Sequence, residues 1–561
     1  MSLIGNAWYL SKEFFFDKET RKKAFILLLV SIIFELVIVY ISVILNKWNN
    51  DFYNALQALN KPALYKALGI FCIIVLFYMI AFVSKYFFHS KLHIYWRQSM
   101  TNNYINKWVN DHAYFGNNLF KTKNDNPDQR ISEDINSFIK LTINISLGLL
   151  SNIISLISFT AILWTLSGVL KFTLFSFDIN ISGYLVWLSI IYAGIGTIIT
   201  YRIGKKLSSI NYAQEQKEAN FRFSMMRFRE NAESVVLYNG IEYEKKVFSR
   251  ALEAIVQNFN SLITINKNLG LWTSLYHNTT TILPIIAACP RFFAKEILLG
   301  GLFQISSAFR EVHSSLSFLV NSFTTIAEYK AIVSRLVEFN NNIENWNKAL
   351  SNNQIKVVTH DKNNIILENL YIHSPVGEVL AKDINLTLSI GESYLISGRN
   401  GAGKSTFVKA LKAVWPFGKG KITIPNYTKL FVIPQKTYMP LGKLIEAIAY
   451  PKTSLNDNER NYLESLMIKL NISYLIDRLN NEENWSISLS LGEQQKIGIL
   501  RAILSNPKIL VMDESTSALT ENDEKLAYTL LKEILVNAII ITIGHRESLK
   551  IYHTKEIKFS V

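Results

Sequence analysis

The sequence has little cysteine and lacks the segments typical of secreted or nucleic-acid-binding proteins. Only two cysteines occur in 561 residues, Cys72 and Cys289, and both lie in apolar runs, which excludes a disulfide framework and a CxxC metal site. The net charge is +15, yet no Lys/Arg tract stands out as a nucleic-acid arm. The N-terminal stretch has no cleavable signal pattern, so we expect the first apolar run to stay in the mature chain as an anchor.

Long apolar runs are abundant. Hydrophobic residues make up 49% of the chain and the mean hydropathy is +0.16, which is unusual for a soluble enzyme. A helix of about 20 apolar residues crosses a hydrocarbon core of about 30 Å, and six runs are candidates. They cover residues 24–45, 68–88, 144–166, 183–203, 275–294 and 298–323. The last two are weaker, because Pro284, Pro290 and the pair Gly300–Gly301 interrupt them.

Basic residues indicate which ends of these spans face the cytoplasm. Arg21, Lys22 and Lys23 precede the first span, so its N-terminal end is predicted to be cytoplasmic. Six spans place both termini and the loops 89–142 and 204–272, which are rich in Lys and Arg, on that same side. Helical periodicity in these loops predicts that the spans continue as helices into the cytoplasm.

Several charged or titratable residues lie inside the predicted spans. Glu35 lies in the first, and Arg310, Glu311 and His313 lie in the sixth. Such groups face a bundle interior or an aqueous cavity. Two interpretations stay open: contact with a translocated substrate or proton, and a structural pair of Glu35 with Arg or Lys.

The composition changes after residue 335. Residues 336–360 are rich in Asn and charge and have little apolar periodicity, so we interpret them as a linker. The sequence thus predicts an α-helical six-span transmembrane domain at 1–335 and an α/β domain at 361–561.

A phosphate-binding loop opens the second half. The run 395–406 reads LISGRNGAGKST and fits the pattern G-x-x-x-x-G-K-[ST]. Its glycines let successive backbone N–H groups converge on phosphate oxygens, and the helix that follows adds its positive end. The lysine supplies a cation, and the serine hydroxyl can reach Mg²⁺. The candidate nucleotide-binding residues are Gly398, Arg399, Asn400, Gly401, Ala402, Gly403, Lys404, Ser405 and Thr406.

Further polar residues follow predicted strands. Gln435 comes after the strand 430–434 and can reach a metal ion and a water nucleophile. The strand 508–514 ends in Asp513 and Glu514, which are predicted to point to opposite faces, one toward Mg²⁺ and one toward a water nucleophile. His545 follows the strand 538–543 and can hydrogen-bond a γ-phosphate. Ser490 suits the N-cap of a helix whose N-terminus can bind an anion.

This ordered series resembles the nucleotide-binding domain of ABC transporters, over the whole second half. The resemblance implies ATP and Mg²⁺ as cofactors, with Ser405, Gln435 and Asp513 near the metal. It implies that Glu514 is the general base, with His545 and Gln435 assisting. The signature segment then brings Ser490, Gly492 and Glu493 to ATP. Leu491 and Thr520 depart from the family pattern, and Thr520 stands where the D-loop usually has Asp.

The first half resembles a narrower group of fused permease–ATPases: SbmA/BacA-like peptide uptake proteins, YddA-like transporters and peroxisomal fatty-acyl transporters of subfamily D. The motifs that carry this resemblance are WNNDFYNALQ at 48–57, NPDQRI at 126–131, ENAESVVLYNGIEYE at 230–244 and ACPRFF at 288–293. The third resembles the EAA-like motif of the group, which implies cytoplasmic contact with the ATPase.

The resemblance implies a half-transporter. One chain carries one phosphate loop and one signature, and in this superfamily the two close on each other across a dimer, so a two-fold homodimer is expected. Its expected surroundings are the lipid of the bacterial cytoplasmic (inner) membrane, and its expected cargo is a small molecule or peptide (a peptide, cobalamin-like or other bulky hydrophilic compound), imported; no nucleic-acid partner is expected. A lipid or fatty-acyl translocator and a membrane-anchored regulatory ATPase without cargo are the alternatives.

Overall fold

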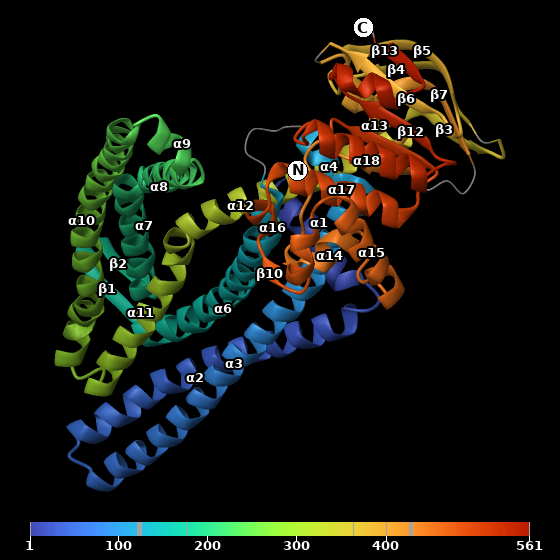
Figure 1. Ribbon diagram of the computed structural model, residues 1–561. Helices are drawn as coiled ribbons and strands as arrows, with labels where there is room; N and C mark the ends of the chain where they lie inside the picture. The colour runs from blue at the N-terminus through green and yellow to red at the C-terminus, as the bar shows by residue number, and fades with distance from the viewer. Residues whose placement is uncertain are drawn as a thin grey trace. The chain divides into compact units, whose positions relative to one another are not determined.

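The computed structural model describes residues 2–119, 126–174, 177–362, 364–399, 401–425 and 430–559 (Figure 1). These residues form two compact units. The helical unit comprises Met1–Lys107 and Asp125–Asn340, and the sheet unit comprises Trp108–Asn124 and Asn341–Val561.

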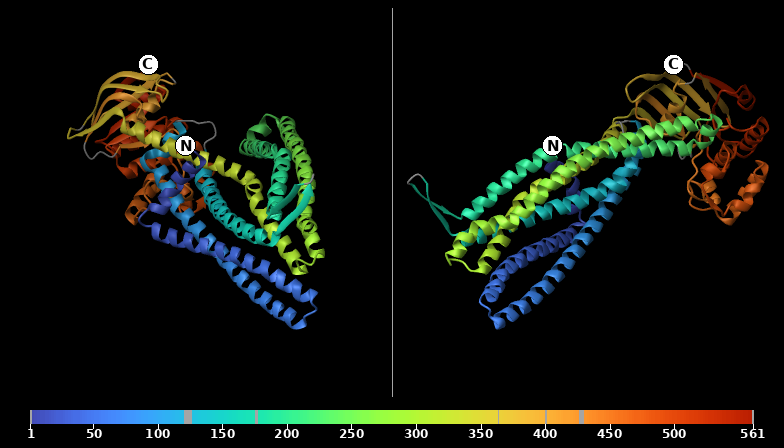
Figure 2. Two further views of the ribbon diagram at one scale, coloured as in Figure 1. Left: turned by 180° about the vertical axis from the view of Figure 1, so that it is seen from behind. Right: turned by 90° about the vertical axis from the view of Figure 1, so that its left-hand side faces the viewer.

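The helical unit consists mainly of long helices. They are α1 (Leu3–Phe16), α2 (Arg21–Gln57), α3 (Lys61–Val109), α5 (Pro127–Gln129), α6 (Ile135–Ser167), α7 (Tyr184–Gly204), α8 (Leu207–Glu230), α9 (Ala232–Leu237), α10 (Ile241–Phe293), α11 (Leu299–Asn321) and α12 (Phe323–Ser351). The strands β1 (Val169–Leu174) and β2 (Phe177–Ser182) pair antiparallel between α6 and α7. Helices α8 and α10 run side by side, as both views of Figure 2 show. The predicted helical extensions of the spans are therefore present.

Four helices of the described residues are long and apolar enough to cross a membrane: Arg21–Gln57, Lys61–Gly116, Pro127–Ser167 and Tyr184–Glu230. They contain the first four predicted spans. The fifth span lies in α10 and the sixth lies largely in α11, and neither helix is among the four, so the count of six is not confirmed.

The predicted interruption of the fifth span is wrong, because α10 continues through Pro284 and Pro290. A proline inside a membrane helix is tolerated where other groups bind the nearby carbonyls. Here the Tyr184 hydroxyl donates to the Ala287 carbonyl at 2.9 Å, and α10 packs against α7 and α11.

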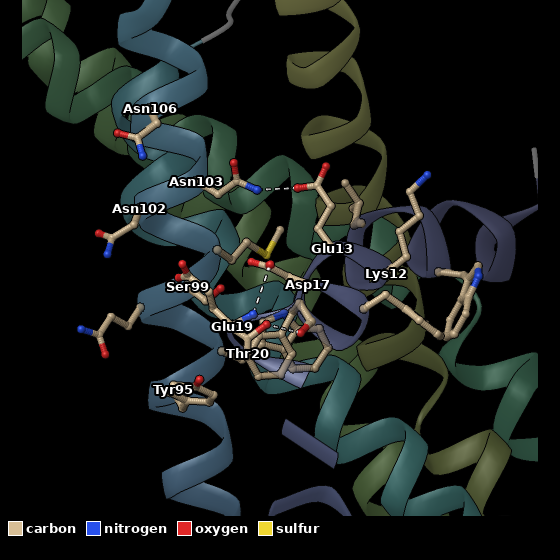
Figure 3. Close-up of a pocket in the computed structure, with 17 residues that line it drawn as sticks. Lys12, Glu13, Asp17, Glu19, Thr20, Tyr95, Ser99, Asn102, Asn103 and Asn106 are labelled. Carbon is tan, nitrogen blue, oxygen red and sulfur yellow. Dashed lines mark hydrogen bonds between the residues drawn. The ribbon is translucent and has the colours of Figure 1, made fainter. Parts of the chain in front are cut away.

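At the N-terminus, α1 is fastened to α3 by one carboxylate. Glu13 accepts from Asn103 Nδ2 at 2.5 Å and from Lys107 Nζ at 2.7 Å. Figure 3 shows the Asn103–Glu13 bond across the cavity between these two helices. These contacts hold the N-terminal helix against the extension of α3 beyond the second predicted span.

The WNNDFYNALQ motif joins α2 to α11 through amide side chains. Amides recur every three or four residues on one face of α2, at Asn46, Asn50, Asn54 and Gln57. Asn50 Nδ2 donates to Gln304 Oε1 at 2.8 Å, and Asn54 Oδ1 accepts from the Gly300 backbone N–H at 2.9 Å. A Cβ atom on Gly300 would lie 2.1 Å from the Asn50 carbonyl oxygen. The motif therefore specifies close helix packing.

Glu35 has a basic partner in the structure. Its side chain is buried, and its Oε1 lies 2.8 Å from Lys85 Nζ. In the sixth predicted span His313 is buried with its Nε2 2.6 Å from the Tyr276 hydroxyl, whereas Arg310 is exposed. The structural-pair interpretation therefore holds for Glu35, and Arg310 keeps the other interpretation open for the sixth span.

The sheet unit contains two sheets. The five-stranded sheet is parallel, with the order β13 (Lys555–Phe559), β6 (Ser393–Gly398), β12 (Ile539–Ile543), β11 (Ile509–Asp513) and β8 (Leu430–Ile433). The four-stranded sheet has the order β3 (Gln354–His360), β7 (Gly418–Pro425), β4 (Asn364–His373) and β5 (Val379–Ser389). The strands predicted from the sequence are confirmed.

Helices cover the parallel sheet, whose central strands are nearly continuous apolar runs, as in IIITI of β12. They are α13 (Lys404–Leu411), α14 (Leu444–Ala449), α15 (Asp457–Lys469), α16 (Trp485–Ser488), α17 (Leu491–Ser505) and α18 (Glu521–Ile534). One core packs β4, β6, β11 and β12 with α13, and a second packs α14, α15, α17 and α18. The sheet is thus a rigid support for the loops at its ends.

Residues 336–360, which we interpreted as a linker, are largely helix and strand. Helix α12 continues to Ser351, and β3 begins at Gln354. The reason is an apolar stripe at helical spacing among the asparagines: Leu336, Phe339, Ile343 and Trp346 are all buried. The two units meet at Asn340–Asn341, inside this segment.

Candidate nucleotide site

The candidate site residues of the sheet unit gather at one edge of the parallel sheet. Lys404 follows β6, His545 follows β12, Asp513 ends β11, and Gln435 lies just after β8. These four strands are neighbours in the sheet, so their carboxyl ends share one edge. Open α/β sheets bind ligands at this edge.

The phosphate loop has the backbone of an anion-binding nest. Gly401 and Gly403 have φ of +82° and +79°, in the left-handed region that favours glycine. Gly403 is the N-cap of α13, and a Cβ atom there would lie 3.2 Å from the Leu380 carbonyl oxygen. Ala402 is buried and its N–H donates to the Arg399 carbonyl at 3.2 Å, while Ser405 is exposed. Asn400 lies outside the described residues, and Thr406 lies in the first turn of α13.

Lys404 connects the loop to the end of β12. Its Nζ is 2.6 Å from the Gly398 carbonyl, 3.1 Å from the Arg399 carbonyl and 3.0 Å from His545 Nε2. An ammonium group only donates hydrogen bonds, so His545 Nε2 must accept. Burial lowers the pKa of Lys404, and the carboxylates of Glu514 and Asp513 oppose that shift.

The backbone at Glu514 adopts a left-handed turn, which the sequence did not predict. The strand β11 ends at Asp513, and Glu514 has a φ of +46°, so a left-handed turn separates the two carboxylates rather than strand alternation. Glu514 Oε2 accepts from Gln435 Nε2 at 2.9 Å, and its Oε1 lies 3.6 Å from His545 Nε2. The three residues proposed for catalysis are therefore in contact.

Asp513 and Ser405 suit a hydrated divalent cation. Burial raises the pKa of Asp513, a hydrogen bond with Ser405 lowers it, and the nearby Glu514 raises it again. A cation would relieve the burial of this charge. Among the described residues no group of three or more His, Cys, Asp or Glu side chains is arranged to hold a metal ion by itself. This donor set fits Mg²⁺, which keeps waters and phosphate oxygens as ligands, better than a metal held by protein alone.

The signature residues form a separate arrangement. Ser490 caps α17: its Oγ accepts from the Glu493 N–H at 3.3 Å, and its own N–H donates to Glu493 Oε2 at 2.7 Å. The Tyr474 hydroxyl also donates to Glu493. Burial would raise the pKa of Glu493, but these hydrogen bonds lower it overall. No hydrogen bond in the described part of the chain joins Ser490 or Glu493 to Lys404 or Ser405.

Residues 517–520, which we call the D-loop, are held by hydrogen bonds with Arg546 and Gln495. The sequence had not indicated this role for either residue. Arg546 donates to the carbonyls of Ser517 and, at 3.2 Å, Leu519. Gln495 Oε1 accepts from the Ala518 N–H at 2.9 Å, and a Cβ atom on Gly492 would lie 3.2 Å from the Ala518 carbonyl oxygen. In the sequence, the only sign of a role for Arg546 was its position directly after His545. The D-loop thus touches both the signature helix and the histidine segment.

Thr520 has a structural role in place of the usual aspartate. It is the N-cap of α18, where its Oγ1 accepts from the Asp523 N–H at 3.2 Å. Capping needs only a short side chain with an oxygen acceptor, so threonine fulfils it.

The fold and this site define the class: an ATP-hydrolysing domain fused to a helical membrane domain. Comparison with known families agrees. Residues 13–293 match the family "ABC transporter transmembrane region 2", and residues 381–517 match the family "ABC transporter". The chain belongs to the ABC transporter family, as a fused membrane and ATP-binding protein that couples ATP hydrolysis to transport.

Relatives with the same organisation cover nearly the whole chain. The inner membrane ABC transporter ATP-binding protein YddA of Escherichia coli is 30% identical over 97% of this chain and 95% of its own length. The human lysosomal cobalamin transporter ABCD4 is 24% identical over 83% of this chain and 80% of its own. The resemblance to the YddA-like and subfamily D group is therefore confirmed.

A solved structure shares the fold. A bacterial Atm1-family ABC exporter with ATP bound matches with a TM-score of 0.67 over 94% of this chain and 93% of its own, at 16% identity. At that identity the match shows the exporter-like fold and nothing about cargo.

Proposed function

We propose that the chain works as a homodimer with two composite ATP sites. The observation that carries this proposal is the division of the site residues into two sets. Lys404, Ser405, Glu514 and His545 gather at the edge of the parallel sheet. Among the described residues, Ser490 forms its side-chain hydrogen bonds with Glu493 of its own helix, and Gly492 faces the D-loop. A second copy would bring its signature to the first copy's phosphate loop, related by a two-fold axis.

Within each site the residues divide the chemistry of hydrolysis. Lys404, with Arg399 and Thr406 in the same loop, binds the phosphates. Glu514, held by Gln435, accepts the proton of the attacking water, and His545 contacts the γ-phosphate. Mg²⁺, held through Ser405, Asp513 and Gln435, would neutralise charge on the phosphates when it is bound.

The helical unit offers a surface for coupling in the motif 230–244. Val236, Leu237 and Tyr238 form its tip and are 63%, 75% and 87% exposed. A cluster of exposed apolar side chains at the end of a helical hairpin indicates a protein contact. We assign it to the ATPase of the dimer, so that closure and opening of the ATP sites move the spans.

The cargo we propose is a bulky hydrophilic compound, a peptide or a cobalamin-like molecule, imported across a bacterial cytoplasmic membrane. Arg310 is exposed on α11 in the sixth predicted span, and a charge at that depth faces water rather than lipid. The human relative is a lysosomal cobalamin transporter, which supports this class. The inner-membrane name of the bacterial relative supports the location.

Proteoliposomes test the proposal. Uptake of a labelled peptide, labelled cobalamin and an acyl-CoA is compared with and without ATP, for the natural chain and for Glu514→Gln. We expect ATP-dependent flux of a hydrophilic cargo that Glu514→Gln abolishes. Flux of the acyl-CoA alone would select the lipid translocator, and hydrolysis without any flux would select the regulatory ATPase.

A further inference from the structure

A basic cavity of about 400 Å³ lies between α3 and α6 of the helical unit. On α3 its wall is formed by side chains spaced three or four residues apart, so they share one face of the helix. The aromatic and basic residues of this wall are Phe82, Lys85, Tyr86, His89 and His93, and Lys140 of α6 also lines the cavity. This cavity has no role in the mechanism above.

The charge of the cavity is positive. None of its described lining residues is acidic. The carboxylate of Glu35 lies 2.8 Å from Lys85 Nζ and 3.7 Å from His89 Nε2. Lys140 is exposed and has no carboxylate within 4.0 Å among the described residues. Lys85 is therefore held in place by Glu35, while Lys140 keeps an uncompensated charge facing the cavity.

The position of the cavity along the chain matches the depth of lipid headgroups. Its α3 wall lies where the second span, 68–88, ends, and Lys140 lies just before the third span, 144–166. Both are the predicted cytoplasmic ends. Phe82 precedes the basic groups along α3 and Tyr86 lies between Lys85 and His89; their side chains are 55% and 72% exposed. Aromatic side chains next to Lys and His at this depth are typical of the boundary between headgroups and acyl chains.

We propose that this cavity binds an anionic phospholipid of the cytoplasmic leaflet, with its phosphate at Lys140, Lys85 and the two histidines and its acyl chains along Phe82 and Tyr86. Basic pockets between membrane helices on the cytoplasmic side bind anionic headgroups. The exposed aromatic wall favours a lipid over a free phosphate ion, which has no apolar part to bury. The proposal does not depend on the cargo or the direction of transport.

Binding of tail-labelled lipids to the purified full-length protein in detergent tests the proposal. Phosphatidylglycerol is compared with phosphatidylethanolamine, for the natural chain, for Lys140→Gln and for Lys91→Gln. Lys91 is an exposed cation on the same stretch of α3 that does not line the cavity, so it controls for general surface charge. Both variants change exposed residues and leave the Glu35–Lys85 pair intact.

We expect phosphatidylglycerol to bind more tightly than phosphatidylethanolamine, and Lys140→Gln to weaken it about five-fold while Lys91→Gln changes it less than about two-fold. Millimolar inorganic phosphate should leave the lipid bound. Equal affinity for the two lipids would overturn the proposal. So would equal losses in both variants, which would indicate surface charge alone, or displacement by inorganic phosphate, which would indicate a free-anion site.

Discussion

Lys404 Nζ and His545 Nε2 lie 3.0 Å apart, which joins the phosphate loop after β6 to the end of the neighbouring strand β12. Because the ammonium must donate, His545 Nε2 is the acceptor of this hydrogen bond. The histidine thus positions the lysine within the phosphate loop. A phosphate entering the loop would meet a pre-oriented cation.

This relationship predicts that an acceptor at position 545 matters more than an imidazole. His545→Ala should lower ATP hydrolysis by about 10²-fold or more, whereas His545→Gln, whose amide oxygen can still accept from Lys404, should retain part of the activity. Steady-state hydrolysis by the reconstituted protein measures both. Equal activity in the two variants would show that the hydrogen bond is unimportant.

Arg546 is predicted to couple the D-loop to the site without binding nucleotide. Arg546→Ala frees the Ser517 and Leu519 carbonyls and should lower kcat about ten-fold with little change in KM. Arg546→Lys should not restore it, because a single ammonium cannot reach both carbonyls as a guanidinium does. Lys525→Ala, an exposed change on α18, serves as the control. A rise in KM alone would contradict this role.

Gly300 and Gly301 form a matched pair for testing the packing of α2 on α11. Gly300→Ala places a Cβ 2.1 Å from the Asn50 carbonyl and should destabilise the protein by roughly 1–3 kcal/mol. Gly301→Ala places one 3.4 Å from Ile297, an ordinary contact, and should be neutral. Thermal unfolding in detergent compares the two. The same unfolding temperature in both variants would mean that the amide motif does not set the helix spacing.

Asp513 is predicted to reduce stability in the absence of nucleotide. Because its pKa is raised, the carboxyl of Asp513 binds its proton more tightly in the folded protein than in the unfolded chain. Proton binding by Asp513 therefore stabilises the fold at low pH, and this stabilisation is lost as the pH rises through the folded pKa. Asp513→Asn should therefore unfold at a higher temperature than the natural chain at neutral pH, with a difference that shrinks below about pH 4. Mg²⁺ and ATP should reverse the order, and their failure to do so would argue against a metal role for Asp513.

The sequence was sufficient for the local architecture of the ATPase. Apolar runs before the phosphate loop, at Asp513 and before His545 predicted the strands β6, β11 and β12, because buried parallel strands leave an unbroken apolar signal. It was not sufficient where tertiary packing decides. The helical stripe around Phe339 and Trp346 is hidden among asparagines, and the left-handed turn at Glu514 has no side-chain signature.

Contacts between distant segments also had no sequence signal. Nothing local indicated that Lys85, fifty residues after Glu35, is its partner, or that Asn50 reaches Gln304. The motif WNNDFYNALQ marked the position of Asn50 in α2, and the structure shows that its amide side chains pack α2 against α11. The sequence could therefore name candidate residues such as Lys404, Asp513 and His545, which the structure brings to one sheet edge. It could not separate structural from functional polar groups in the spans.

The composite site is tested most directly by complementation between two inactive chains. Lys404→Ala lacks the phosphate-binding cation and Ser490→Arg lacks the signature serine, so each alone should hydrolyse almost no ATP. When the two are co-expressed with different tags and the mixed dimer is isolated, one intact site should form from the phosphate loop of the Ser490→Arg chain and the signature of the Lys404→Ala chain. We predict that the mixed dimer regains up to about half of the natural activity. A mixed dimer that forms but stays inactive would contradict the account.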